Sequence, residues 1–333
     1  MSSKAPRYLQ EAAALFEAAA SRVREVEKVS VVAHIKPDAD AIGSACALTA
    51  GLRKLGKDAQ AYIGQPLPHS ANMRTIPGVE DIRYGEPLPE DGLVITVDCA
   101  SADRTGAHMS TILKDPSRVV VIDHHNTNPG FGGLNMIVES ESTTVMVREL
   151  LGYLGVELDP DIAYALYAGL ITDTGSFRWG TPRMHELAAE LMEYGLNTRQ
   201  IALDLMDTMG PVDLQLMGAV LAKTQIVPAN GLSVAVLTIP SGIHSRMSQT
   251  AVEAIIDYAR ALEGTDVGVV LKEQSPKSWA LSLRSTVVDV SAVAQRLGGG
   301  GHKAAAGYSA SGHRNEVIRD LLSALPQRDA SDE

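Results

Sequence analysis

The sequence contains two cysteines in 333 residues, Cys46 and Cys99. So few exclude a scaffold built on disulfides, and each lies in an apolar stretch, so we expect both to be reduced and buried. No apolar run approaches the roughly 20 residues that a membrane-spanning helix needs. The N-terminal segment alternates alanine, leucine and charged residues with a helical period, and it lacks the uninterrupted apolar stretch of a signal peptide. These absences predict a cytoplasmic protein that does not associate with membranes.

An excess of basic residues is also missing. The chain has 29 lysines and arginines against 40 aspartates and glutamates, which gives a net charge of −11 at pH 7. Proteins that bind long nucleic acid normally present a basic surface, because phosphate contacts dominate such affinity. The charge therefore argues against long duplex nucleic acid as a partner. A short nucleotide drawn into a local cationic pocket remains compatible with it.

The length allows two domains, each with a substantial core. Short apolar runs rich in β-branched residues alternate with helical patterns, which indicates βαβ units and a mostly parallel sheet. We predict an α/β fold with a mostly parallel N-terminal domain over residues 1–190. A helical connector over residues 191–227 would lead to a smaller α/β domain over residues 228–328. Ser142 or Thr143 is expected to cap a helix that runs through residue 154.

Potential metal ligands occupy four short clusters between residues 34 and 173. They are His34, Asp38 and Asp40 in HIKPDAD, Asp98 in ITVDC, His124 in the triplet DHH, and Asp173 in ITDTG. At least three clusters follow a short apolar run, so their polar groups lie where buried strands end. Ligands bind at the carboxyl ends of strands in an open α/β sheet. Four carboxylates and two imidazoles that converge there suit two divalent cations better than one.

Two metal ions point to hydrolysis of a phosphoester. The negative charge of a phosphodiester repels a nucleophile, and two divalent ions neutralise that charge and lower the pKa of a water molecule. Carboxylates suit Mg²⁺ or Mn²⁺, and added imidazoles shift the preference toward Mn²⁺ and other first-row metals. A single aspartate after a strand is more often a turn or helix-cap residue than a ligand. The combination of four such clusters in one half of the chain favours the metal site.

A glycine run near the C-terminus could supply donors for the phosphate of a substrate. Residues 298–301 are all glycine, and His302 and Lys303 follow them. Glycines let the backbone approach a phosphate and direct N–H groups toward it, particularly at the start of a helix. Arg284, at the end of a predicted strand, adds a bidentate guanidinium. A glycine run alone is more often a flexible connector, and the neighbouring histidine and lysine favour the binding site.

Trp179 follows Asp173 by six residues. An indole beside a nucleotide site can stack on a base. Packing in the core or at the rim of the site accounts for this tryptophan equally well. The sequence leaves both alternatives open.

The four clusters match, in order and type, the motifs of the DHH phosphoesterase superfamily. The triplet of Asp123, His124 and His125 is the one for which that superfamily is named, and GGGGHKAAAG resembles the signature of the DHH-associated C-terminal domain. The size and arrangement are similar to the subfamily of bifunctional oligoribonucleases and pAp phosphatases. The resemblance implies an enzyme that hydrolyses short oligoribonucleotides, pAp, pApA and cyclic di-AMP, and that forms a homodimer.

The resemblance also implies a set of metal ligands. His34, Asp38 and Asp98 would hold one Mn²⁺. The ligands of the second Mn²⁺ would be Asp40, Asp98, His124 and Asp173. Asp98 would thus bridge the two ions, for which Mg²⁺ or Co²⁺ could substitute.

Further roles follow from the same resemblance. Asp123 would orient a neighbouring imidazole. His125 would face the scissile phosphate as a hydrogen-bond donor or as a general acid. Substrate would be bound from the opposite side of an interdomain cleft by Arg284, Gly299, Gly300, Gly301 and His302.

Three alternatives remain open. A family II pyrophosphatase would share the N-terminal motifs, but its relatives carry a basic C-terminal signature in place of GGGGH. A RecJ-like exonuclease for long single strands would be larger and more basic. A nucleotide-binding regulator without catalysis fits poorly with a complete set of ligands.

Overall fold

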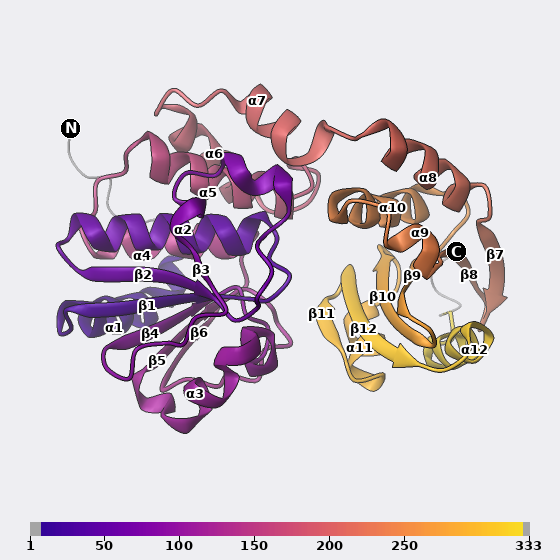
Figure 1. Ribbon diagram of the computed structural model, residues 1–333, viewed down its shortest axis with the longest axis horizontal. Helices are drawn as coiled ribbons and strands as arrows, with labels where there is room; N and C mark the ends of the chain where they lie inside the picture. Colours follow the sequence, from indigo (N-terminus) through magenta and orange to yellow (C-terminus); the bar gives the residue numbers. More distant parts are fainter. Residues whose placement is uncertain (1–7, 329–333) are drawn as a thin grey trace. The chain divides into compact units, whose positions relative to one another are not determined.

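The computed structural model describes residues 8–328 and divides the chain into two compact units between Thr208 and Met209. Each unit has its own sheet (Figure 1). Each also has its own hydrophobic core. Helix α7 (Thr198–Ala202) of the predicted connector belongs to the first unit, and α8 (Pro211–Leu221) belongs to the second. Within residues 8–328, no helix has both the length and the apolar composition needed to cross a membrane.

The first unit is built on a parallel sheet of six strands in the order β3-β2-β1-β4-β5-β6. The strands are β1 (Lys28–Ala33), β2 (Asp58–Ile63), β3 (Arg83–Tyr84), β4 (Leu93–Val97), β5 (Val119–Asp123) and β6 (Leu134–Ile137). Neighbouring side chains of β1 enter different cores, Val31 on one face of the sheet and Val32 on the other. Because both faces are covered, the central strands are apolar throughout. The predicted α/β class is confirmed.

Helices cover the two faces of this sheet unequally (Figure 1). They are α1 (Ala13–Arg24), α2 (Ala39–Lys54), α3 (Met109–Lys114), α4 (Thr143–Tyr153), α5 (Pro160–Asp173), α6 (Pro182–Met192) and α7. The larger core contains residues from α1, α2, α4 and α5. On the opposite face, Ile112 of α3 packs with Val32 and Tyr62 in a smaller cluster.

Helices α2 and α5 approach each other closely because glycines lie at their contact. A Cβ added to Gly43 would lie 2.3 Å from the carbonyl oxygen of Ala165. A Cβ added to Gly169 would lie 2.5 Å from Oδ1 of Asp40. Distances this short are far inside van der Waals contact, so the backbones can be this close only without side chains at these two positions.

The start of α4 was predicted correctly, but the predicted cap was wrong. Ser142 is the N-cap residue, yet its hydroxyl bonds the hydroxyl of Thr144 rather than a backbone N–H. The carboxylate of Asp40 accepts the backbone N–H groups of Thr143 (2.7 Å) and Thr144 (3.0 Å) instead. An anion is favoured at a helix N-terminus, where backbone donors lack partners within the helix. Asp40 therefore caps a helix that lies about one hundred residues further along the chain.

The second unit has a mixed six-stranded sheet in the order β11-β12-β10-β9-β8-β7, in which β8 and β9 are parallel. Its strands are β7 (Gln225–Ala229), β8 (Leu232–Ile239), β9 (Val267–Ser275), β10 (Ser278–Ser285), β11 (Gly300–His302) and β12 (Ala305–Ser311). Its helices are α8, α9 (Ser241–His244), α10 (Gln249–Ala261), α11 (Val290–Arg296) and α12 (Arg314–Ala324). This arrangement confirms a second α/β domain.

The glycine run lies in a hairpin and does not begin a helix. It follows α11 and enters the hairpin of β11 and β12, in which Gly301 is opposite Ala306. A Cβ on Gly299 would lie 2.1 Å from the carbonyl oxygen of Gly307, and Gly301 has a φ of 136°. Both positions therefore require glycine for packing of the hairpin.

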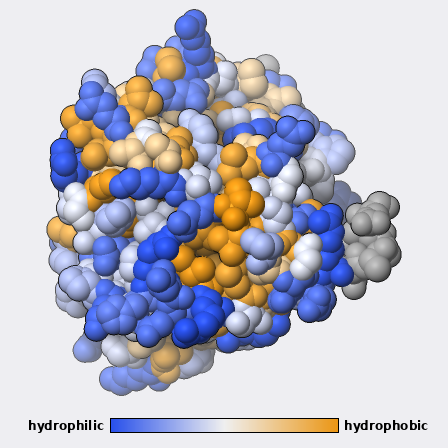
Figure 2. Space-filling view, turned by 90° about the vertical axis from the view of Figure 1, so that its right-hand side faces the viewer, coloured by the Kyte–Doolittle hydropathy of each residue, from blue (hydrophilic) through white to orange (hydrophobic). Residues whose placement is uncertain are grey.

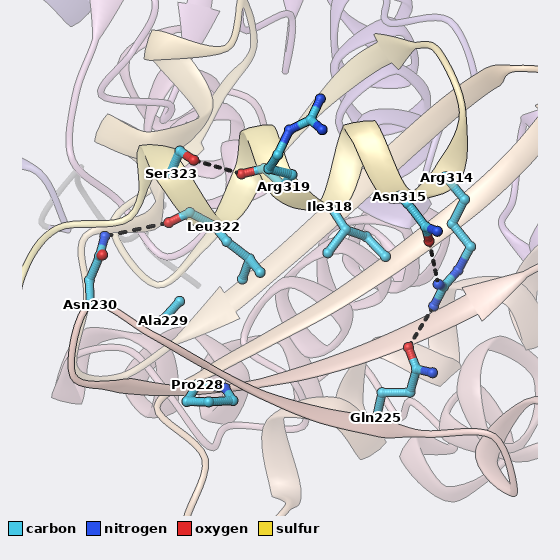
Figure 3. A pocket seen from close by; sticks show the side chains of 10 residues that line it. All are labelled: Gln225, Pro228, Ala229, Asn230, Arg314, Asn315, Ile318, Arg319, Leu322 and Ser323. Carbon is cyan, nitrogen blue, oxygen red and sulfur yellow. Dashed lines mark hydrogen bonds between the residues drawn. The ribbon is translucent and has the colours of Figure 1, made fainter.

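A surface groove of about 430 Å³ lies between β7 and α12 (Figure 3). Ile318 and Leu322 contribute apolar side chains, and Arg314 donates to the side chain of Gln225. The residues that line this groove include none of the predicted substrate-binding residues. On the side of the second unit that carries β7, hydrophobic residues gather within a hydrophilic surround (Figure 2).

Candidate metal centre

The predicted ligands lie together at the carboxyl edge of the parallel sheet. His34 follows β1, Asp98 follows β4, and His124 follows β5. Two further carboxylates come from Asp40 in the first turn of α2 and from Asp173 at the last position of α5. Adjacent parallel strands end at the same edge, so segments far apart in the sequence meet there.

The first group of potential ligands consists of His34, Asp38 and Asp98. Their ligand atoms all lie within 4.8 Å of one another. Nε2 of His34 is 3.5 Å from Oδ2 of Asp38 and 3.3 Å from Oδ2 of Asp98. Separations of this size leave room for one cation among the three atoms.

The second group consists of Asp40, Asp98 and His124, with Asp173 beside it. The first three offer atoms within 4.8 Å of one another. Nε2 of His124 is 3.5 Å from Oδ1 of Asp98 and 3.2 Å from Oδ2 of Asp173. Asp98 therefore directs Oδ2 toward the first group and Oδ1 toward the second.

The backbone at Asp98 is held in an unusual conformation. Its φ is 59°, in the left-handed region that aspartate tolerates better than most residues. Its N–H donates to the carbonyl of Ile122, and its Oδ1 accepts a hydrogen bond from the hydroxyl of Thr143 at 3.1 Å. The side chain is 3% exposed. These contacts fix the carboxylate between the two groups.

Backbone carbonyls orient both histidines. Nδ1 of His124 lies 3.1 Å from the carbonyl oxygen of Ser140, and Nδ1 of His34 lies 2.9 Å from that of Ile35. A carbonyl only accepts, so the contact with Ser140 places a proton on Nδ1 of His124 and leaves Nε2 as its ligand atom. Arg104 also lies 2.9 Å from Nδ1 of His34. A guanidinium only donates, whereas the carbonyl of Ile35 only accepts, so the two neighbours of Nδ1 of His34 favour different protonation of that atom. Metal binding through Nε2 of His34 requires its Nδ1 to carry the proton and to donate to Ile35.

The charges of the cluster suit divalent cations. Burial raises the pKa of Asp40 to about 7, and the charge of Asp98 adds to the rise. Burial alone would lower the pKa of His34, but Asp38 and Asp98 outweigh it and raise this pKa to about 10. Without a cation, the excess negative charge is thus compensated by retained protons. A divalent ion can replace these protons, because metal binding requires deprotonated ligands.

Asp123 and His125 form a pair beside these groups, and Nδ1 of His125 lies 3.7 Å from Oδ1 of Asp98. Oδ1 of Asp123 accepts from Nδ1 of His125 at 2.8 Å, and its Oδ2 accepts from Nδ2 of Asn128 at 2.6 Å. Asn128 also donates to the carbonyl of Cys99 and accepts from the N–H of Gly130. Asp123 is fully buried, whereas the side chain of His125 is 22% exposed. The pair can hold Nε2 of His125 ready to exchange a proton with a bound molecule.

Several residues of this centre were not identified from the sequence. Asn128, Thr143 and Ser140 contact the predicted residues through hydrogen bonds that no spacing rule reveals. Asn128 lies five residues after Asp123, and that proximity was the available signal. Arg284 and His302 lie in the second unit, where each pairs with Ala305 across neighbouring strands.

Replacing Gly169 with alanine tests the close packing against Asp40. The new Cβ would meet Oδ1 of Asp40, so we expect the carboxylate to shift and the affinity for Mn²⁺ to fall by about tenfold or more. Overpacking should also lower the free energy of unfolding by about 1–3 kcal/mol. Isothermal titration calorimetry and thermal unfolding measure the two effects.

Gly51→Ala is the matched control, because there the new Cβ would meet the flexible side chain of Leu151. It should lower stability without changing the affinity for Mn²⁺. Equal metal affinity in the two variants would contradict a role of Gly169 in positioning Asp40.

Comparisons with known proteins match both units. The DHH family, N-terminal domain, matches residues 28–170, and the DHHA1 domain matches residues 231–328. The chain is 32% identical over 292 residues to the bifunctional oligoribonuclease and PAP phosphatase NrnA of Thermus thermophilus, covering 85% of this chain and 84% of that protein. It is 25% identical over 323 residues to the cyclic-di-AMP phosphodiesterase GdpP of Bacillus subtilis, covering 92% of this chain and 48% of that protein.

A solved structure has a similar fold. An exopolyphosphatase-related protein from Bacteroides fragilis superposes with a TM-score of 0.80 at 21% identity. The superposition covers 94% of this chain and 95% of that one. The likeness therefore extends to the folds of both units.

Proposed function

The chain belongs to the DHH family, and from that premise we propose that it hydrolyses short oligoribonucleotides and small adenine nucleotides with the help of two divalent metal ions. The observation that carries this proposal is the position of Asp98. Its two carboxylate oxygens face two different groups of ligand atoms, which is the arrangement that a carboxylate shared by two cations requires.

The donor set fits the proposed ions. One ion would be held by His34, Asp38 and Asp98. The other would be held by Asp40, Asp98, His124 and Asp173. Bound there, the ions would offset the charge of a phosphoester and make water a better nucleophile at neutral pH. The mixture of carboxylates and imidazoles favours Mn²⁺, with Mg²⁺ or Co²⁺ as alternatives.

His125 is the proposed proton donor. Water attacks the phosphorus and releases a proton to the solvent, the bond to the 3′-oxygen breaks, and the departing oxygen takes a proton from Nε2 of His125. Asp123 accepts from Nδ1 of the same ring and orients it, while Asn128 holds Asp123 in place. The products are a free 3′-hydroxyl and a 5′-phosphate.

The second unit is the proposed binder of substrate. Arg284 and His302 pair with the same residue, Ala305, from opposite sides, so their side chains emerge on one face of the sheet. Along β10 and β12 this face carries small residues, among them Ser282 and Gly307. A guanidinium and an imidazole beside this face of small residues suit the binding of a phosphate and its sugar. Gly299, Gly300 and Gly301 are proposed to supply further N–H donors.

We further propose pApA, cyclic di-AMP and pAp as substrates, since the relatives named above act on PAP, oligoribonucleotides and cyclic di-AMP. The net charge of −11 disfavours long strands. A homodimer in the cytoplasm is the proposed state, and the free, buried cysteines agree with a reducing compartment.

Product analysis in the presence of Mn²⁺ tests the proposal. pApA, cyclic di-AMP, pAp, a long RNA and pyrophosphate are offered in parallel. Conversion of pApA to AMP, with the long RNA and pyrophosphate nearly unchanged, is expected. Preferred hydrolysis of pyrophosphate would indicate a pyrophosphatase, and preferred digestion of the long strand a RecJ-like exonuclease. Binding of pApA without turnover would indicate a regulator.

His302→Ala separates binding of substrate from binding of metal. We expect the KM for pApA to rise by about tenfold, because a donor to the substrate is lost, while the affinity for Mn²⁺ stays unchanged. Steady-state kinetics and calorimetry provide the two numbers. His244→Ala, in the same unit, should change neither. Loss of Mn²⁺ affinity in His302→Ala would contradict the proposed division of roles.

A further inference from the structure

The chain makes an unusual turn directly after the ligand Asp173. Gly175, Ser176 and Phe177 have φ values of 55°, 62° and 62°. Left-handed conformations cost residues with a side chain about 1–2 kcal/mol each, which applies to Ser176 and Phe177 but not to Gly175. The N–H of Ser176 bonds the carbonyl of Ile171, and the N–H of Phe177 bonds the hydroxyl of Thr174. These contacts hold a strained turn, which is typical of functional segments.

The turn brings Trp179 back to Asp173. The indole N–H donates to the carbonyl oxygen of Asp173 at 2.8 Å. The ring also packs on Gly175, where an added Cβ would lie 2.2 Å from Cζ2. The indole is thus fixed beside the end of α5 by a hydrogen bond and by close packing. Its orientation is linked to that of a potential metal ligand.

Despite this fixation, Trp179 is 41% exposed. The sequence has one other tryptophan, Trp279, which is 5% exposed and packs in the core of the second unit. Burial of an indole contributes strongly to stability, and a rigid indole that stays partly exposed to water does not make this contribution in full. An exposed, rigid aromatic side chain is a feature of surfaces that bind ligands.

Arg178, the residue before Trp179, places a positive charge at this indole. The guanidinium carbon of Arg178 lies 5.1 Å from the centre of the indole ring. Its Nε donates to the carbonyl of Gly175, which keeps the arginine at the turn. The guanidinium lies over one face of the indole, so a base would stack on the opposite face. An aromatic ring and a cation are the two features that bind bases and phosphates in single-stranded nucleic acids.

We propose that Trp179 is the stacking platform for a nucleobase of the substrate, and that it makes the site select nucleotides over phosphoesters without a base. This inference rests on the proposed function, since it names a contact of the same substrate. Asp173 is a ligand of one proposed metal ion, and the indole is bonded to the same residue. A nucleotide whose phosphate is at the metal ions would therefore have its base within reach of the ring.

Kinetics with matched substrates test the stacking. Trp179→Ala should raise the KM for pApA by between about 5-fold and about 150-fold, the effect of removing one base–aromatic stack. Its kcat should stay within about threefold. An abasic dinucleotide with the same sugars and phosphates should be affected by neither Trp179→Ala nor Trp179→Phe. Trp179→Phe should retain most of the affinity for pApA, because a ring remains.

Tyr258→Ala is the control, because Tyr258 is 50% exposed and lies on α10 in the second unit. It should leave both substrates unchanged. Equal losses on pApA and on the abasic dinucleotide in Trp179→Ala would show that the indole only positions Asp173, which overturns the proposal. Absence of pApA hydrolysis by the wild-type protein would instead contradict the proposed function.

Fluorescence gives a readout that needs no turnover. Titration of the Mg²⁺-loaded protein with AMP should change the tryptophan emission of the wild type. In Trp179→Phe, where only Trp279 remains, the same titration should leave the emission constant. If calorimetry shows that AMP binds the wild type while its emission stays constant, the stacking proposal fails even if the enzyme hydrolyses pApA.

Discussion

Replacing Asp98 with asparagine is expected to lower turnover of pApA by at least about 10³-fold, because one carboxylate serves both proposed metal ions. Oδ2 faces the first group of ligands and Oδ1 faces the second, so loss of one charge affects both. Asparagine is the informative substitution. It tolerates the left-handed conformation at φ 59°, and its carbonyl oxygen can still accept from Thr143.

The metal content of Asp98→Asn decides between explanations. We expect fewer than two Mn²⁺ per chain by elemental analysis, together with lower thermal stability of the metal-free protein, since the carboxylate of Asp98 pairs there with His34 and His124. Asp91→Asn is the control, because Asp91 is an exposed partner of Lys28. If Asp98→Asn bound two Mn²⁺ and kept activity within tenfold of the wild type, the shared carboxylate would be refuted.

Replacing His125 with alanine is expected to lower kcat by about 10²–10⁴-fold, the usual contribution of a general acid. Two Mn²⁺ should remain bound, because Nδ1 of His125 is bonded to Asp123 and the ring belongs to neither proposed ligand set. Asn128→Ala should cause a smaller fall, of about 10–100-fold, because it only loosens Asp123.

The neighbouring histidine provides the matched comparison. His124→Ala removes a proposed ligand, so it should lose both turnover and metal. Metal analysis and single-turnover kinetics on the two variants distinguish the roles. If His125→Ala lost metal to the same extent as His124→Ala, His125 would have to be assigned to the ligands.

The sequence predicted those parts of the fold that rest on local patterns. Val31 and Val32 belong to a short apolar run, which is the pattern of a strand covered on both faces, and Asp98 follows another such run. The convergence of the residues that follow these strands could be predicted, because neighbouring parallel strands end at the same edge of the sheet. The cap of α4 could not be predicted, since Asp40 reaches Thr143 across about one hundred residues. The preference for serine side chains at helix N-termini points to Ser142 as the cap instead.

Other differences have the same origin. Strand β7 contains proline and strand β12 contains glycine and alanine, which weaken the local strand pattern, but each strand pairs with a neighbour in the sheet. The glycine run resembles a phosphate-binding helix start, but pairing with β12 makes it a hairpin. The support that Asn128 gives to Asp123 depends on a loop conformation that no periodicity encodes.

Asp40 both caps α4 and is a proposed metal ligand, so we expect the availability of metal to affect how fast the protein is degraded. Its oxygens hold the first turn of α4 while they face the proposed second ion, and without a cation its raised pKa leaves it partly protonated at neutral pH. A ligand that binds only the folded state stabilises it by mass action. We expect chelated protein to be cleaved faster than Mn²⁺-loaded protein in a proteolysis assay, with early cuts near α4; equal rates would disprove this. Limitation of the metal in the cell would then lower both the activity of the protein and its amount.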